Sequence, residues 1–66
     1  MIKEYSSVIA TKDLSDKVKN GCIGAVVMIY DFPDLPLGYE VEFVDADGWT
    51  LDVLTVEPKD IELQNS

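Results

Sequence analysis

The sequence contains no histidine and no arginine, and its 66 residues include a single cysteine, Cys22. The lack of histidine excludes the usual catalytic triads and most zinc sites, because both depend on imidazole. One cysteine cannot form an internal disulfide, and the apolar stretch "GCIGAVVMIY" around Cys22 is typical of a small buried hydrophobe. We therefore expect a protein that is not an enzyme and that binds no cofactor.

Long hydrophobic runs are also missing. No apolar run approaches the roughly 20 residues that span a membrane as a helix, and the start, "MIKEYSS", lacks the apolar stretch of a signal peptide. We expect a cytoplasmic protein with no membrane contact. Residues 1–66 are enough for one domain with a thin core, and a hydrophobic content of 47% makes such a core feasible.

Basic side chains are scarce, because five lysines stand against thirteen acidic residues and the formal net charge is −8. The imbalance is uneven: residues 1–19 sum to +1, whereas residues 20–66 sum to −9. Lysine and arginine supply most of the affinity for phosphate backbones, so direct nucleic-acid binding is not expected. The acidity either keeps the chain soluble or attracts a basic protein partner.

Turn-forming residues divide what remains into short apolar runs. Turn signals at this spacing predict a small sandwich or barrel, with strands at 5–11, 21–31, 40–44, 49–56 and 61–64. Leu14 and Val18 predict a loop pinned between the first two strands, and Gly24 predicts a bulge or sharp bend. The expected core is Val8 or Ile9, Leu14, Ile23, Val26 or Val27, Tyr39, Val41, Phe43, Leu51, Val53 and Ile61.

The stretch "DADG" (45–48) predicts a hairpin turn between two strands with alternating apolar residues. A three-residue loop, 46–48, would pair Phe43 with Leu51 and Val41 with Val53, which places both apolar sets on one face. Such a loop has its last residue, Gly48, at positive φ. An EF-hand would need an oxygen ligand at the fifth position and Glu at the twelfth, and these are Trp49 and Val56. We therefore expect no metal site here.

The same register makes the opposite strand face acidic, with Glu42 directly opposite Asp52. Like charges in that position are destabilising, so the face is a candidate contact site for a basic partner. The alternative is that loops and termini cover its apolar residues and that its acids are only solvated. Trp49, beside the turn, could contribute because tryptophan is common at interaction hot spots. The candidate partner-binding residues are Glu40, Glu42, Trp49, Asp52, Leu54 and Val56.

Three stretches of the chain carry a family resemblance: "TKDL" at 11–14, the pattern G-x-x-G-x-V-V-x-x-Y at 21–30, and "YEVEFVDADGWTLDVLTVEPKDI" at 39–61. Together they resemble a family of short bacterial proteins, the domain of unknown function numbered 4926. The resemblance implies a small SH3-like barrel, similar to KOW-type ribosomal and transcription-factor modules. The family has no assigned function, so the resemblance implies no functional residues, and the segment 31–38 is longer than the tight turn of the family pattern.

We thus predict an all-β fold, a small five-stranded antiparallel SH3-like barrel. The expected function is that of a non-enzymatic module that binds or inhibits a basic protein, in the manner of an antitoxin or immunity protein. The alternative is a KOW-like module associated with nucleic acid or the ribosome, for which Lys12, Lys17 and Lys19 would have to supply the basic surface.

Overall fold

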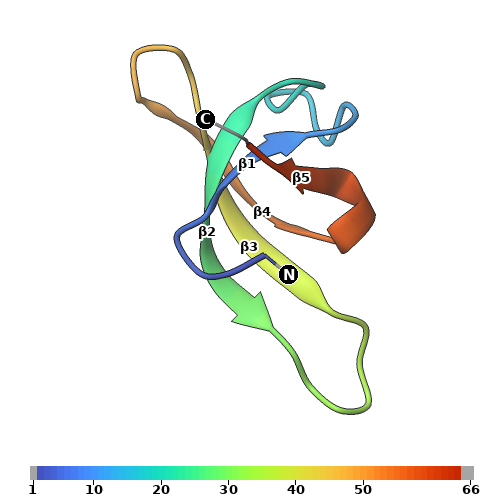
Figure 1. Cartoon of the computed structure of the whole chain (residues 1–66). Coiled ribbons are helices and arrows are strands. Elements are labelled where there is room, and N and C mark those ends of the chain that lie inside the picture. The colour runs from blue at the N-terminus through green and yellow to red at the C-terminus, as the bar shows by residue number, and fades with distance from the viewer. Residues whose placement is uncertain (1, 65–66) are drawn as a thin grey trace.

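The computed structural model describes residues 2–64, which form one antiparallel sheet of five strands (Figure 1). The strands are β1 (Ser7–Ala10), β2 (Ile23–Tyr30), β3 (Gly38–Val44), β4 (Thr50–Val56) and β5 (Ile61–Leu63), and a short 3-10 helix, η1 (Pro58–Asp60), precedes β5. The predicted all-β fold class and the expected number of strands are confirmed.

The strand order in the sheet is β4-β3-β2-β1-β5. Consecutive strands pair from β1 to β4, and β5 then returns to pair with the free side of β1. The sheet is strongly coiled, so that β1 and β5 lie in front of β3 and β4 in Figure 1, with β2 at the bend. The short 3-10 helix η1 connects the edge strand β4 to β5 at the opposite edge of the sheet.

The core lies inside the coiled sheet, and most of its predicted members are confirmed. Phe43 is the largest of the fully buried side chains. The loop 11–22 contributes Val18, which is fully buried and whose carbonyl accepts a 2.8 Å hydrogen bond from the Leu14 N–H, so this segment is a pinned loop as predicted. The buried apolar residues are Val8, Ala10, Val18, Val26, Tyr39, Val41, Phe43, Val56 and Ile61.

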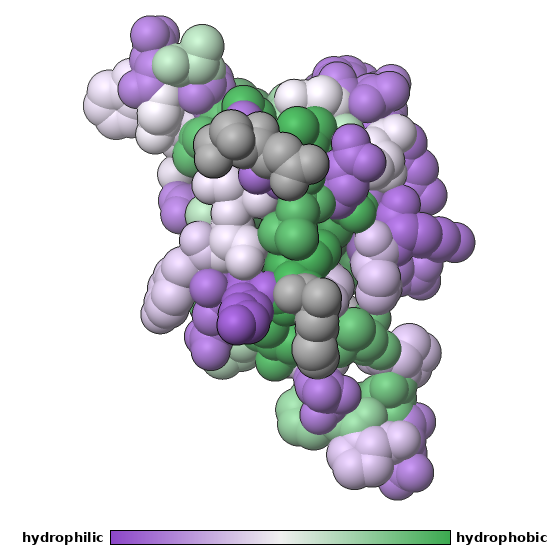
Figure 2. Space-filling view, viewed as in Figure 1, coloured by the Kyte–Doolittle hydropathy of each residue, from purple (hydrophilic) through white to green (hydrophobic). Residues whose placement is uncertain are grey.

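Apolar side chains also reach the surface. Figure 2 shows a band of them down the middle of one face, between hydrophilic side chains on both sides. Two predicted core residues belong outside: Ile23 is 41% exposed and Val53 is 48% exposed. Conversely Val56, expected on the acidic face, is buried. The errors at Val53 and Val56 have one cause, because the pairing between β3 and β4 changes register within β4.

The hairpin turn itself has the predicted form. The Asp45 N–H donates to the Trp49 carbonyl at 2.9 Å, which leaves three residues, 46–48, in the loop. Gly48 has a φ of +88°, as the odd-length loop requires. The Asp45 Oδ1 accepts the N–H groups of Asp47 and Trp49 at 2.9 and 3.0 Å. The Asp45 side chain therefore has a structural role in the turn.

Beyond the turn, a β-bulge overturns the predicted pairing. Val44 lies opposite Thr50 as the loop dictates, but Phe43 then lies opposite Asp52 and not Leu51. Leu51 is the extra residue, and Val41 consequently pairs with Leu54 and not Val53. In a regular strand, Leu51 would face one side of the sheet, and Leu54 and Val56 would face the other. The bulge brings both sets to the core side, where Leu51 and Leu54 pack against the buried residues.

Gly24 does not form the predicted bulge. It pairs regularly with Val8 and with Phe43, and the bulge of β2 falls between Val26 and Met28. Gly24 is required for close packing instead: a Cβ at this position would lie 2.7 Å from Cγ1 of Val41 and 2.9 Å from the carbonyl oxygen of Glu42. A side chain would therefore collide with β3.

Candidate functional site: the outer face of β2, β3 and β4

Three cross-strand rows form the outer face of the sheet, on the side away from the core. The strand register aligns each β3 residue with one neighbour in β2 and one in β4, and alternate residues of β3 share a face. Each of the nine positions is exposed or half-buried. We call these residues the outer face: Met28, Glu40 and Thr55; Ala25, Glu42 and Val53; Ile23, Val44 and Thr50.

Two carboxylates, of Glu40 and Glu42, are the only charged groups of the outer face. Hydroxyl groups of β4 hold both: Thr50 donates to Oε2 of Glu42 at 2.6 Å, and Thr55 donates to Oε1 of Glu40. Tyr30 donates to Oε2 of Glu40 at 3.3 Å. Desolvation at its half-buried position, together with the Glu40 charge, raises the pKa of the Tyr30 phenol, which keeps it protonated as a donor.

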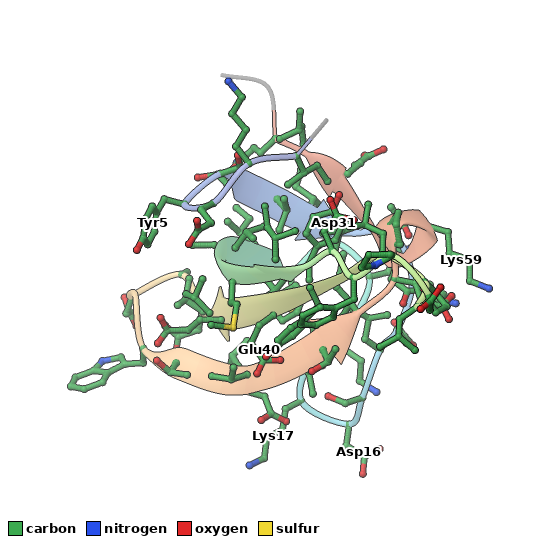
Figure 3. The ribbon with its side chains drawn as sticks, turned by 90° about the horizontal axis from the view of Figure 1, so that it is seen from below. Tyr5, Asp16, Lys17, Asp31, Glu40 and Lys59 are labelled. Atoms are coloured by element: carbon green, nitrogen blue, oxygen red, sulfur yellow. The ribbon has the colours of Figure 1, made fainter. Side chains whose placement is uncertain are left out.

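Neither carboxylate is neutralised by a lysine within residues 2–64. The ion pairs in this part of the chain join Lys12 to Asp60 and Lys59 to Glu57. Figure 3 shows Glu40 near the middle of the sheet and Lys59 well apart from it on η1. The hydroxyl donors orient the two carboxylates but carry no positive charge that would compensate them.

Exposed apolar groups surround these carboxylates. Met28 lies beside Glu40 in the ladder and is 50% exposed, and Val53 lies beside Glu42. Ile23 closes the third row. Sequence reasoning missed these residues because it placed Ile23 and Val53 in the core. One signal was present in the sequence. Thr50 and Thr55 are an odd number of residues apart, so in a regular strand they would face opposite sides of the sheet. Both can lie on the same face as Glu40 and Glu42 only if β4 contains a bulge.

The structure separates the candidate residues that the sequence analysis had grouped. Glu40 and Glu42 are on the outer face, whereas Leu54 and Val56 point to the core side. Asp52 lies opposite the buried Phe43, so the predicted Glu42–Asp52 repulsion was wrong. The Asp52 carboxylate instead accepts the N–H of Val53 at 2.9 Å.

Trp49 lies at the base of the hairpin loop and is 74% exposed. Its backbone is fixed by the turn through two hydrogen bonds to Asp45, one from its N–H and one to its carbonyl. The indole is therefore presented to solvent from a defined position, next to the row of the outer face that ends in Thr50.

A pocket of about 450 Å³ opens beside this end of the outer face. The walls come from the beginning of β2 and from the hairpin, and two wall residues, Ile23 and Val44, are paired members of the outer face. The pocket therefore shares two residues with the outer face, and Cys22 and Leu51, which pack against the core, also line it. Its lining residues are Asn20, Gly21, Cys22, Ile23, Val44, Asp45, Ala46 and Leu51.

Comparison with known families identifies the chain. The family described as "Domain of unknown function (DUF4926)" matches residues 4–63, which is nearly the whole sequence. The chain belongs to the DUF4926 family. No curated protein and no solved structure matches it. Family membership therefore assigns no activity to the chain.

Two further findings concern the described part of this DUF4926 chain. Over residues 2–64, no group of three or more histidine, cysteine, aspartate or glutamate side chains is arranged to hold a metal ion. The same part of the chain contains no helix long and apolar enough to cross a membrane.

Proposed function

We propose that this protein is a non-enzymatic interaction module that binds a basic protein partner through its outer face. The observation that carries the proposal is the pair of hydroxyl-bound, uncompensated carboxylates, Glu40 and Glu42, set among exposed apolar side chains. Apolar contact area with a few oriented charges is the usual composition of a protein interface. A lysine- or arginine-bearing surface would compensate both charges and cover Met28 and Val53 at the same time.

Charge supports the choice of a basic partner. Residues 20–66 sum to −9, and such a field accelerates encounter with a cationic protein and repels an anionic one. A module that covers a functional surface of a basic protein would inhibit it. An antitoxin-like or immunity-like role is therefore the specific form that we propose.

A nucleic-acid or ribosome-associated role finds less support. Lys12 and Lys59 are engaged in ion pairs, and the outer face that a barrel of this kind would present carries only negative charge. A phosphate backbone would meet repulsion there. This alternative is retained as an outcome of the test.

The test is affinity capture from nuclease-treated native lysate with three immobilised forms of the chain. The first is the wild type, and the second carries Glu40→Gln with Glu42→Gln, whose amide oxygens can still accept the threonine hydroxyls. The third is a matched control, Asp31→Asn with Asp34→Asn, which removes two acids from the exposed loop 31–37. Captured proteins are identified and their association rates are measured at low and high salt.

We expect a basic protein that is retained by the wild type and by the loop control, and that binds the Glu40/Glu42 variant more slowly and with weaker salt dependence. Equal binding of that protein to all three forms would contradict the proposal. Retention of RNA or DNA in untreated lysate, with no protein retained after nuclease treatment, would favour the alternative role.

A further inference from the structure

The pocket at the base of the 45–49 hairpin has the features of an anchoring subsite. Five of its lining residues, Cys22, Ile23, Val44, Ala46 and Leu51, present apolar or weakly polar side chains. Its volume of about 450 Å³ is within the range of roughly 300–1,000 Å³ that is typical of ligand pockets. Such a volume is sufficient for one large apolar side chain of a partner.

Hydrogen bonds hold the walls of the pocket on both sides. On one side, the Gly21 N–H donates to the Ala10 carbonyl at 2.8 Å and the Cys22 N–H donates to the Lys19 carbonyl at 3.0 Å. On the other side, the Asp45 side chain closes the turn. Because these hydrogen bonds hold both walls, filling the pocket requires little ordering of the protein, which favours binding.

The surroundings of the pocket are predominantly acidic. Asp45 and Asp47 are exposed on the hairpin, and Asp13 binds the Asn20 N–H at 2.9 Å on the opposite side. Lys19 is the one lysine adjacent in sequence to the lining. Asp45 lines the pocket, Asp13 binds the lining residue Asn20, and Asp47 and Lys19 are next in sequence to lining residues. The acids outnumber the one lysine, so an apolar group enters most favourably when positive charges flank it.

We propose that this pocket takes one large apolar side chain, such as leucine, from a basic segment of the protein partner. The inference rests on the proposed function, since the pocket shares Ile23 and Val44 with the outer face. A partner lying across Glu40 and Glu42 could thereby place an apolar side chain in the open pocket beside them. Anchors of this kind supply a large share of the binding free energy in protein interfaces.

The experiment uses two synthetic peptides, acetyl-Lys-Lys-Leu-Lys-Lys-amide and acetyl-Lys-Lys-Ser-Lys-Lys-amide, titrated into the isotopically labelled full chain and followed by amide chemical shifts. We expect the leucine peptide to shift the amides of Cys22, Val44 and Ala46 saturably. The serine peptide should bind at least about tenfold more weakly, since an apolar side chain in a fitting pocket contributes on that scale. Equal affinity of the two peptides would overturn the pocket proposal.

A pair of variants at Ala46 strengthens the test. Ala46 is exposed, and its φ is not positive, so a larger side chain is tolerated by the turn. Ala46→Leu extends a side chain from the pocket wall and should abolish the preference for the leucine peptide. Ala46→Ser, the matched control, should keep it. A preference that persists unchanged in Ala46→Leu would also overturn the proposal.

Failure of the pocket and failure of the proposed function give different results. If the outer face binds basic segments but the pocket is unused, both peptides shift Glu40, Glu42 and Met28 equally and leave Cys22 unshifted. If the outer face does not bind basic segments, neither peptide shifts the Glu40 and Glu42 amides. The Glu40→Gln/Glu42→Gln variant should weaken both peptides alike and leave the leucine-to-serine ratio as it is in the wild type.

Discussion

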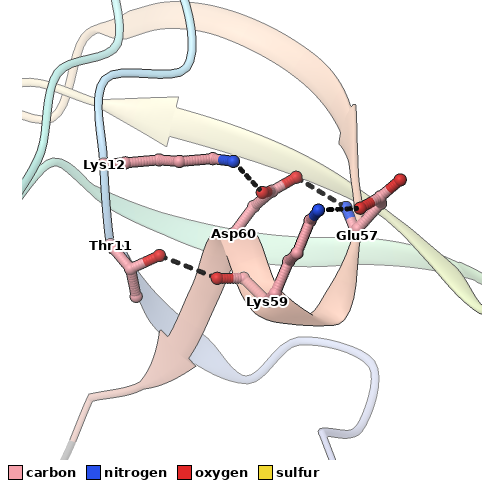
Figure 4. Close-up of polar contacts among 5 residues, drawn as sticks. All are labelled: Thr11, Lys12, Glu57, Lys59 and Asp60. Atoms are coloured by element: carbon pink, nitrogen blue, oxygen red, sulfur yellow. Dashed lines mark hydrogen bonds and ion pairs between the residues drawn. The ribbon is translucent and has the colours of Figure 1, made fainter.

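The ammonium group of Lys12 lies 3.0 Å from Oδ1 of Asp60, and the second carboxylate oxygen of Asp60 accepts the Glu57 N–H at 2.9 Å (Figure 4). Asp60 Oδ1 is buried, and Lys12 is the group that compensates it. The Thr11 hydroxyl donates to the Lys59 carbonyl at 2.9 Å. These contacts join the start of the loop 11–22, which follows β1, to η1, which precedes β5.

This arrangement predicts a loss of stability in acid. The hydrogen bond from the Glu57 N–H, and then the Lys12 ammonium group, lower the pKa of Asp60 below its ordinary value. A depressed folded-state pKa contributes stability that is present above the unfolded-state pKa of about 3.9 and is lost as the pH falls through the folded-state value. Asp60→Asn should lower the free energy of unfolding by about 1 kcal/mol at neutral pH, the scale of a lost cap. It should also reduce the further loss of stability as the pH falls.

Urea denaturation of the wild type and of Asp60→Asn between neutral pH and pH of about 2 measures both effects. Asp31→Asn, in an exposed loop, is the control and should keep the wild-type pH dependence. If the free energy of unfolding fell equally steeply with decreasing pH in Asp60→Asn, other carboxylates would dominate the pH dependence.

Gly24→Ala is expected to destabilise the protein. The new methyl group would lie 2.9 Å from the Glu42 carbonyl oxygen, a backbone atom that cannot move without displacing β3. Overpacking of this kind costs about 1–3 kcal/mol. Gly38→Ala is the matched control, because its nearest neighbour atom would be 3.7 Å away. Thermal or urea unfolding should show a large loss for the first variant and little change for the second.

Gly48→Val tests the hairpin turn. No atom lies within 4 Å of a Cβ at this position, so any loss comes from the backbone, whose φ of +88° disfavours a β-branched residue. The free energy of unfolding should fall by about 1 kcal/mol or more. Gly48→Asn should lose less, because asparagine tolerates positive φ. Equal stability of the valine variant and the wild type would contradict the turn assignment.

Asp52 is predicted to limit self-association. Strand β4 is at an edge of the sheet, and the Asp52 carboxylate accepts the hydrogen bond of the Val53 N–H. Exposed edge amides pair readily with strands of other chains, and charged side chains at edges suppress this. Asp52→Ala should raise the associated fraction in sedimentation experiments at increasing concentration. Thr55→Ala, also on β4 and exposed, is the control, and an unchanged distribution for Asp52→Ala would show that Asp52 has no such role.

Local sequence signals predicted much of the fold. Turn residues separated the strands, and Leu14 with Val18 indicated a pinned loop. The odd-length hairpin and the positive φ of Gly48 followed from the requirement that apolar residues of β3 and β4 share a face near the turn. Each of these depends on contacts between residues that are close in sequence, which is why the sequence was sufficient for them.

The composition of the outer face could not be predicted in this way. Strand side chains alternate, so one extra residue moves every later side chain of the strand to the other face. The bulge at Leu51 exchanged Val53 for Val56 in the core and removed Asp52 from the neighbourhood of Glu42. The candidate face therefore kept Glu40 and Glu42, and gained Met28 and Ile23 from β2.

The sequence by itself determined the all-β class, the strands, the turn at 45–49 and the excess of negative charge, because these follow from local periodicity, turn chemistry and composition. Only the tertiary structure decided which residues of β4 face the core. In a regular strand, Leu51 and Leu54 would lie on opposite faces of the sheet. A bulge that turns both toward the core is favoured only because they can pack there against Phe43, Val41 and the other buried residues.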